Sequence, residues 1–148
     1  MTLLVTDSGF IPDDWADGYV PLAALSDTAD PTLNVAVDLN SPVLRSREWD
    51  RLRAALPRIG LIRIRLRDFG DVEALDLAST LRRHQYGGRL RAHGAMLARC
   101  YTLARRAGFD EVELDPAQAR RQTCEHWRNE PGWFPRTDRI AGGLRSGA

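Results

Sequence analysis

Four short segments alternate between apolar and polar residues, and this alternation constrains the fold more than any other feature of the chain. The segments are residues 33–39, 60–66, 89–94 and 111–114. Successive side chains of a β-strand point to opposite faces of its sheet, so a two-residue period indicates a strand. We therefore predict four strands, each with one apolar face and one polar or charged face.

Between these segments, apolar residues recur every three to four positions, which is typical of helices with one buried side. Ser46 and Asp71 are placed to cap the first two predicted helices, and a third helix is predicted for Ala95–Ala107. A fourth helix is expected to begin after Asp115, because Gln118 stands where a capping box requires it.

The order of these elements predicts an α/β fold. Strands that alternate with helices form mainly parallel sheets through right-handed crossovers. A sheet covered by helices on both sides would need strands that are apolar on both faces. We therefore predict a four-stranded sheet of βα repeats with helices on one face, similar to half of a β/α barrel, preceded by a short irregular N-terminal segment.

The chain has 148 residues, which is a common length for one domain. We predict a single α/β domain over residues 1–134, with an irregular extension at 1–30 and a flexible tail at 135–148. Within the extension, residues 3–5 are apolar enough to form a small strand.

Composition argues against several classes of protein. The 20 acidic and 21 basic residues leave a formal net charge of +1, so a nucleic-acid partner is not expected. No apolar run has the length of a membrane span or of a secretory leader. The two cysteines are too few for a disulfide scaffold. We therefore expect a cytoplasmic protein without membrane contact.

The polar faces of the four strands carry charges that alternate in sign across the predicted sheet. They are Asp38, Arg63, Arg65, Arg89, Arg91, His93, Glu111 and Glu113. Three interpretations are open: a solvated face with cross-strand ion pairs, a protein interface, or an oxyanion site based on arginine forks. The residues expected to form an anion site or an interface are Arg63, Arg65, Arg91, His93, Asp38 and Glu113.

No motif for a nucleotide, flavin, haem or iron–sulfur cofactor is present, and we expect no cofactor. The run Cys124-Glu125-His126 does not have the spacing of a zinc site, and no second cluster completes four ligands. We therefore predict no metal site, and no catalytic residue can be assigned. His93 is the one member of the charged set that could exchange a proton near neutral pH.

Two runs resemble a known family. They are Tyr-Gly-x-x-Leu-Arg-Ala-x-Gly at residues 86–94 and Arg-x-Gly-Phe-Asp at residues 106–110. Together with the residues around them they resemble the bacterial domain-of-unknown-function family 934. The chain looks like a divergent member, because residues 70–75 replace a glycine-rich segment of the family and His93 stands where the family has a small apolar residue.

This resemblance implies a pathway. The family is typically encoded beside sulfite reductase and is often labelled a probable oxidoreductase. Sulfite reduction needs a cofactor for which this chain has no motif. The resemblance therefore implies an accessory protein of assimilatory sulfite reduction, with sulfite reductase or another sulfur-assimilation protein as its partner. The alternative is a small oxyanion-binding domain or enzyme that uses Arg65, Arg91 and His93.

Overall fold

The four predicted strands are present in a computed structural model of the chain, which describes residues 2–25 and 35–129. They are β4 (Val35–Leu39), β5 (Ile59–Leu66), β6 (Arg89–Gly94) and β7 (Glu111–Leu114). These strands lie side by side in chain order, and each pairs in parallel with the next. Residues 33–34 of the first predicted strand and the predicted tail at 135–148 lie outside the described residues.

The sheet has seven strands, so the prediction of a four-stranded half-barrel was wrong. The additional strands are β1 (Leu3–Thr6), β2 (Gly9–Pro12) and β3 (Val20–Pro21). The order is β2-β1-β7-β6-β5-β4-β3, and β1 runs antiparallel to both of its neighbours. The sheet is therefore mixed, although most of its strands are parallel.

Short length and the lack of alternation explain why β2 and β3 were missed. The predicted strand at residues 3–5 is confirmed as part of β1, but β2 has four residues and β3 has two. β2 and β3 lack the apolar–polar alternation that predicted β7, and their glycine and proline residues resemble turns. Residues 2–25 thus contribute three short strands to the sheet and are not wholly the irregular extension that was predicted.

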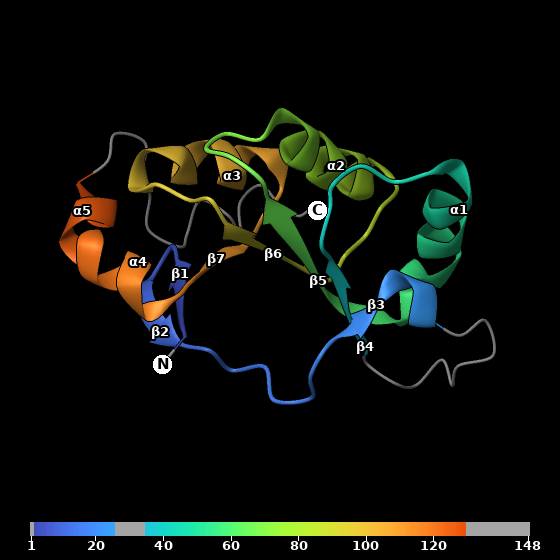
Figure 1. Cartoon of the computed structure of the whole chain (residues 1–148), viewed down its shortest axis with the longest axis horizontal. Coiled ribbons are helices and arrows are strands. Elements are labelled where there is room, and N and C mark those ends of the chain that lie inside the picture. Colours follow the sequence, from blue (N-terminus) through green and yellow to red (C-terminus); the bar gives the residue numbers. More distant parts are fainter. Residues whose placement is uncertain (1, 26–34, 130–148) are drawn as a thin grey trace.

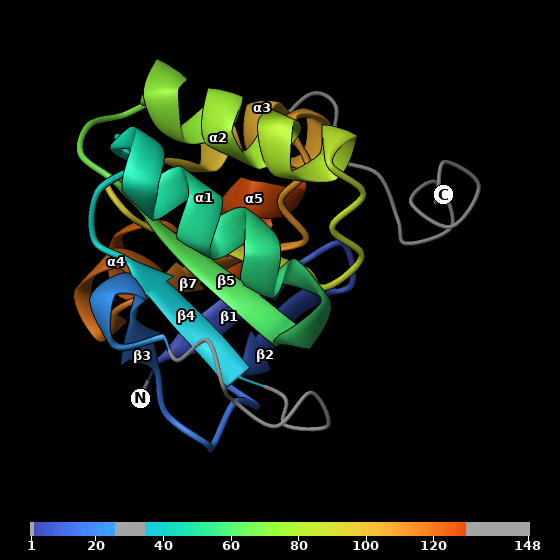
Figure 2. The ribbon, with the colours of Figure 1, turned by 90° about the vertical axis from the view of Figure 1, so that its right-hand side faces the viewer.

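The helices that connect β4 to β7 lie on one side of the sheet. Figure 1 shows α1 (Ser46–Ala55), α2 (Val72–Arg83) and α3 (Tyr101–Ala107) above the strands, and Figure 2 shows the same layer from the side. The chain between β2 and β3 crosses the opposite side of the sheet (Figure 1). The prediction of helices on one face is therefore confirmed for these three helices.

Two further helices, α4 (Pro116–Arg121) and α5 (Cys124–Arg128), lie near the β1–β2 hairpin (Figure 1). Asp115 and Gln118 form the predicted capping box of α4, with each side chain accepting the other residue's backbone N–H. Asp71 caps α2, as predicted, by accepting the N–H groups of Glu73 and Ala74.

Two predicted helix starts were wrong. The N-cap of α1 is Arg45, whose N–H donates to the Glu48 carboxylate, and Ser46 is the first helical residue. The third helix does not begin at Ala95, because that residue's N–H donates to the carbonyl of Leu66 in the sheet. A single 3₁₀ turn at Ala98–Cys100 leads into α3 instead.

The main core lies between this helix layer and the apolar face of the sheet. Apolar strand residues expected on that face are fully or almost fully buried, and helix residues at i, i+3 and i+4 cover them. The strand residues are Val37, Leu39, Ile62, Ile64, Leu66, Leu90, Ala92, Val112 and Leu114. Burial of this face explains why the alternation in the sequence predicted the register correctly.

Arg82 of α2 joins two loops at the amino ends of β6 and β7. Its guanidinium donates to the carbonyls of Tyr86, Gly88 and Gly108 and to the carboxylate of Asp110. Asp110 also accepts the backbone N–H of Leu90 at 2.9 Å. We call this set of contacts the Arg82 junction, and it connects both runs that carry the family resemblance.

Tyr86 and two glycines make the junction tight. The Tyr86 hydroxyl donates to the carbonyl of Ile59 and lies within 3.3 Å of the carbonyl of Arg89. A side chain at Gly88 would collide with the Tyr86 ring, and one at Gly108, where φ is +122°, would lie 2.7 Å from Arg82. Gly88 and Gly108 therefore have a packing reason that requires no ligand.

We expect Arg82→Gln to lower the free energy of unfolding by about 3 kcal/mol, because it leaves several carbonyls and the Asp110 carboxylate without their donor. Arg83→Gln is the matched control, since Arg83 is exposed and, within the described part of the chain, its side chain bonds only to Thr80 of its own helix. That control should change stability by less than about 0.5 kcal/mol. Urea unfolding followed by circular dichroism would measure both. Equal effects of the two variants would contradict the role given to the junction.

Candidate functional site: the charged sheet face

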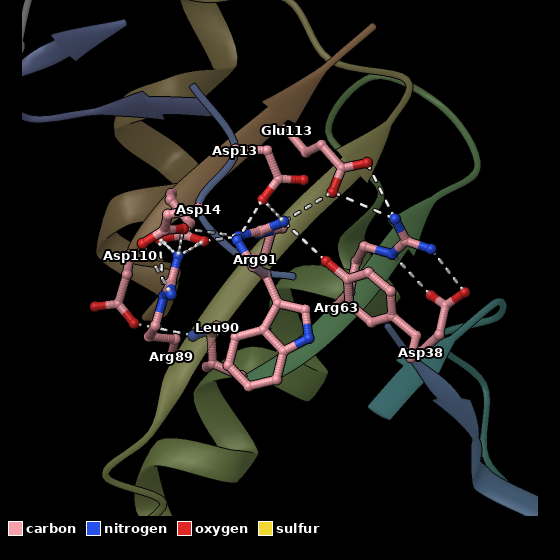
Figure 3. Close-up of polar contacts among 12 residues, drawn as sticks. Asp13, Asp14, Asp38, Arg63, Arg89, Leu90, Arg91, Asp110 and Glu113 are labelled. Atoms are coloured by element: carbon pink, nitrogen blue, oxygen red, sulfur yellow. Dashed lines mark hydrogen bonds and ion pairs between the residues drawn. The ribbon is translucent and has the colours of Figure 1, made fainter. Parts of the chain in front are cut away.

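The polar side chains of β4 to β7 lie on the face of the sheet opposite the helix layer, and we call this the charged sheet face. Figure 3 shows how Asp38, Arg63, Arg91 and Glu113 form a continuous chain of contacts across the strands. All of them were predicted to share this face, and the strand register places them there.

Arg91 is the centre of the face, with a side chain that is 0% exposed. It donates to Glu111 at 2.7 Å and to Glu113 at 3.1 Å, both on the neighbouring strand β7. It also donates to Asp13 at 3.1 Å and to the Tyr19 hydroxyl at 2.8 Å, both in the segment between β2 and β3. A buried guanidinium is thus paired with carboxylates from two distant parts of the chain.

The guanidinium of Arg91 remains charged despite its burial. Burial by itself lowers the pKa of this group, but the negative charge and hydrogen bond of Glu111 outweigh it and raise the pKa above its ordinary value. Charged hydrogen bonds of this kind are among the strongest in proteins, and a buried charge without them would be very costly. Arg91 and its carboxylates therefore depend on one another.

Arg63 and Arg89 extend the network on either side of Arg91. Arg63 forms a two-pronged contact with Asp38, at 3.0 and 3.1 Å, and a contact with Glu113 at 3.1 Å. Its guanidinium also stands 3.9 Å from the centre of the Tyr19 ring. On the other side, Arg89 donates to Glu111 and to Asp14, each at 2.8 Å.

The segment 13–19 covers this part of the face, and we call it the cover segment. Its Asp13, Asp14 and Tyr19 contact the arginines, as Figure 3 shows for both aspartates. Within the segment, the Trp15 indole N–H donates to the carbonyl of Gly18 at 2.8 Å. The chain thus shields the middle of its own charged sheet face from solvent.

This cover overturns the interpretation of a fully solvated face. The sequence did not connect Asp13, Asp14 or Tyr19 with the arginines, because these contacts join residues more than 70 positions apart. No local pattern predicts such contacts. The only hint was an acidic pair close to the N-terminus in a chain with an otherwise balanced charge.

Arg65 and His93 lie outside the cover and form a different local arrangement. They occupy paired positions near the carboxyl ends of β5 and β6. Arg65 is exposed and has no hydrogen bond or ion pair within residues 2–25 and 35–129. The Nε2 atom of His93 is buried without a hydrogen-bond partner and lies 3.8 Å from an oxygen of Asp38.

The environment of His93 favours its neutral form. Burial, followed by the positive charge of Arg63, lowers the pKa of this imidazole, and the carboxylates of Glu113 and Asp38 oppose the shift only in part. A neutral imidazole with a free Nε2 can accept or donate one hydrogen bond, depending on its tautomer. Together with the unpaired guanidinium of Arg65, it could contact an oxyanion at the open end of the face.

No group of three or more potential metal ligands gathers in the part of the chain that the structure describes. Cys124 and Cys100 are free thiols, and the latter is buried. None of the described helices has both the length and the apolarity needed to cross a bilayer.

Comparison with known protein families gives one result. Residues 43–131 match the family described as "Bacterial protein of unknown function (DUF934)". The chain belongs to the DUF934 family. The match includes the Arg82 junction, Arg63, Arg91 and Glu113, whereas the cover segment and Asp38 precede it. Searches of curated proteins and of solved structures find no match to this DUF934 chain.

We expect Arg91→Ile to destabilise the protein by about 3–5 kcal/mol, because Asp13 loses its counter-charge and Glu111 and Glu113 each lose one of the two arginines that they contact. Arg65→Ile on the same face should cost less than about 0.5 kcal/mol, because Arg65 is exposed and unpaired among the described residues. Urea unfolding of both variants would measure the difference. A small loss for Arg91→Ile would show that the face is solvated after all.

The half-buried His93 should make stability depend on pH. The pKa of His93 in the folded protein lies below its value of about 6.5 in the unfolded chain. As the pH falls below about 6.5, the unfolded chain therefore takes up a proton more readily than the folded protein, and the free energy of unfolding decreases. Wild-type protein should therefore lose more unfolding free energy between about pH 7.5 and 5 than His93→Gln does. An NMR titration of the imidazole would measure the pKa directly, and a value above 6.5 would contradict the prediction.

Proposed function

We propose that this DUF934 protein is an accessory protein of assimilatory sulfite reduction that acts in the cytoplasm through protein contacts. The pathway rests on what the resemblance of the two runs at residues 86–94 and 106–110 implies. The family match over residues 43–131 supports membership of a family whose description names no function. The proposed partner is sulfite reductase or another protein of sulfur assimilation.

The observation that best supports a non-catalytic role is the internal pairing of the charged sheet face. Arg63, Arg89 and Arg91 all bind carboxylates of the same chain. A group that acts on a substrate must present free donors or acceptors to it, whereas most donors of these arginines are used by carboxylates within the described chain. The exception is the Nη2 atom of Arg91, which has no hydrogen-bond partner among the described residues and is fully buried. The three arginines serve to hold the cover segment in place.

A second function is favoured by one specific observation. Arg65 lacks an ion pair among the described residues, and the neighbouring His93 has a buried Nε2 without a hydrogen-bond partner. A sulfite, sulfate or phosphate oxygen could complete both groups. In this alternative the protein is a small oxyanion-binding domain or enzyme. Arg91, which the sequence placed in the same site, would support the sheet and would not contact the anion.

A gene deletion tests the accessory role. The deletion strain should grow slowly with sulfate or sulfite as the sole sulfur source, and cysteine should restore growth because it enters after the blocked step. Sulfite reductase activity in extracts should fall in parallel. Normal growth together with normal extract activity would contradict the proposal.

Complementation then tests the working surface. The Arg65→Gln gene should restore growth poorly if the open end of the charged sheet face contacts the partner or an anion. Arg106→Gln is the matched control, because Arg106 is an exposed arginine on α3 in the helix layer.

Calorimetric titration of the purified protein with sulfite, sulfate and phosphate separates the two functions. Anion binding that Arg65→Gln abolishes would favour the oxyanion-binding domain over the accessory protein.

A further inference from the structure

A groove lies between the β1–β2 hairpin and the last two helices of the described chain, and none of its lining residues belongs to the charged sheet face. Its volume is about 410 Å³. The lining residues are Leu3, Phe10, Pro116, Ala119, Arg120, Thr123 and Cys124. Leu3 and Phe10 come from the hairpin, and the others come from α4, α5 and the turn between them. This volume is within the range of small-molecule sites.

The groove is mostly apolar, with a single charged residue in its lining. Apolar atoms make up most of its lining, and Arg120 is the only charged residue among those that form it. Arg120 is exposed and has no hydrogen bond or ion pair within residues 2–25 and 35–129. An apolar surface beside one free guanidinium is complementary to a molecule with an apolar body and one anionic group.

The neighbouring strand edge is poorly suited to a polypeptide partner. A peptide could add to β2 only if that edge strand were accessible along its length. However, α5 packs against β2, and the Cys124 sulfur lies 3.7 Å from the position that a Cβ would take at Gly9. The strand is also four residues long and ends in Pro12, which cannot donate a backbone hydrogen bond.

We propose that this groove binds a small amphipathic anion, with the apolar body against Leu3, Phe10 and Ala119 and the carboxylate, sulfonate or phosphate group on Arg120. The site is independent of the proposed role in sulfite reduction, because it uses none of the residues of the charged sheet face.

Two dyes test the two halves of this chemistry. Anilinonaphthalene sulfonate has an apolar ring system and one sulfonate, and N-phenyl-1-naphthylamine has a similar ring system without the charge. The full chain should bind the sulfonate dye at one saturable site. Arg120→Gln should weaken the sulfonate dye roughly tenfold and leave the neutral dye unchanged. Arg121→Gln is the matched control, because Arg121 is exposed next to Arg120 and does not line the groove.

Filling the groove provides a second test. Ala119→Trp should abolish binding of both dyes, and Thr123→Trp should do the same if Ala119→Trp fails to fold by circular dichroism. Dye binding that persists in a folded Trp variant would overturn the proposal, as would a full chain that does not bind the sulfonate dye.

Cys124 reports directly on occupancy. Its thiol lines the groove and is partly exposed, whereas Cys100 is buried, so N-ethylmaleimide should modify Cys124 first. The sulfonate dye should slow the modification of Cys124 in the wild type. In the Cys124→Ser variant this fast modification should be absent. If Cys124 resists N-ethylmaleimide without dye at every protein concentration, the chain covers its own groove. If the resistance of Cys124 increases with protein concentration and sedimentation gives twice the mass of one chain, a second copy occupies the groove. Either outcome would overturn the proposal.

Discussion

The buried guanidinium of Arg91 is the constraint on which the charged sheet face depends. A charge with 0% exposure is tolerated only when opposite charges and hydrogen bonds replace the water that it has lost. Here Glu111 and Glu113 supply two of those contacts from the adjacent strand, and Asp13 supplies another from the cover segment. The cover segment is therefore held across the sheet by an electrostatic requirement, whereas residues before and after it, such as Val5 and Leu22, pack into the apolar core.

Arg82 has a structural role at the amino ends of β6 and β7. Arg82 gathers carbonyls from two loops, so that α2, β6 and β7 are joined at one point. Three residues that carry the family resemblance, Tyr86, Gly108 and Asp110, lie within or against this junction. Packing and backbone hydrogen bonds account for these positions. This part of the family motif is thus a signature of the fold.

The surfaces left available for function are consequently few and chemically distinct. At the open end of the charged sheet face, Arg65 and His93 offer polar groups that the described chain does not satisfy. At the β2–β1 end of the sheet order, the groove beside these strands offers apolar surface and Arg120. The first surface suits a polar or anionic contact and the second an amphipathic one. Neither Arg65 nor Arg120 contacts Arg91, so each can be replaced without removing a partner of that buried charge.

The sequence by itself determined the four central strands, their register and the side on which the crossover helices lie, because each strand buries one face and a two-residue period records that burial. It also placed Arg63, Arg91, Asp38 and Glu113 on one face. Only the tertiary structure decided that this face is covered, since the contacts of Asp13 and Tyr19 with Arg91 span more than 70 residues and leave no periodic trace. The short edge strands were decided in the same way. β2 and β3 are held by their neighbours in the sheet, and their own sequences lack the alternation that predicted the four-residue strand β7.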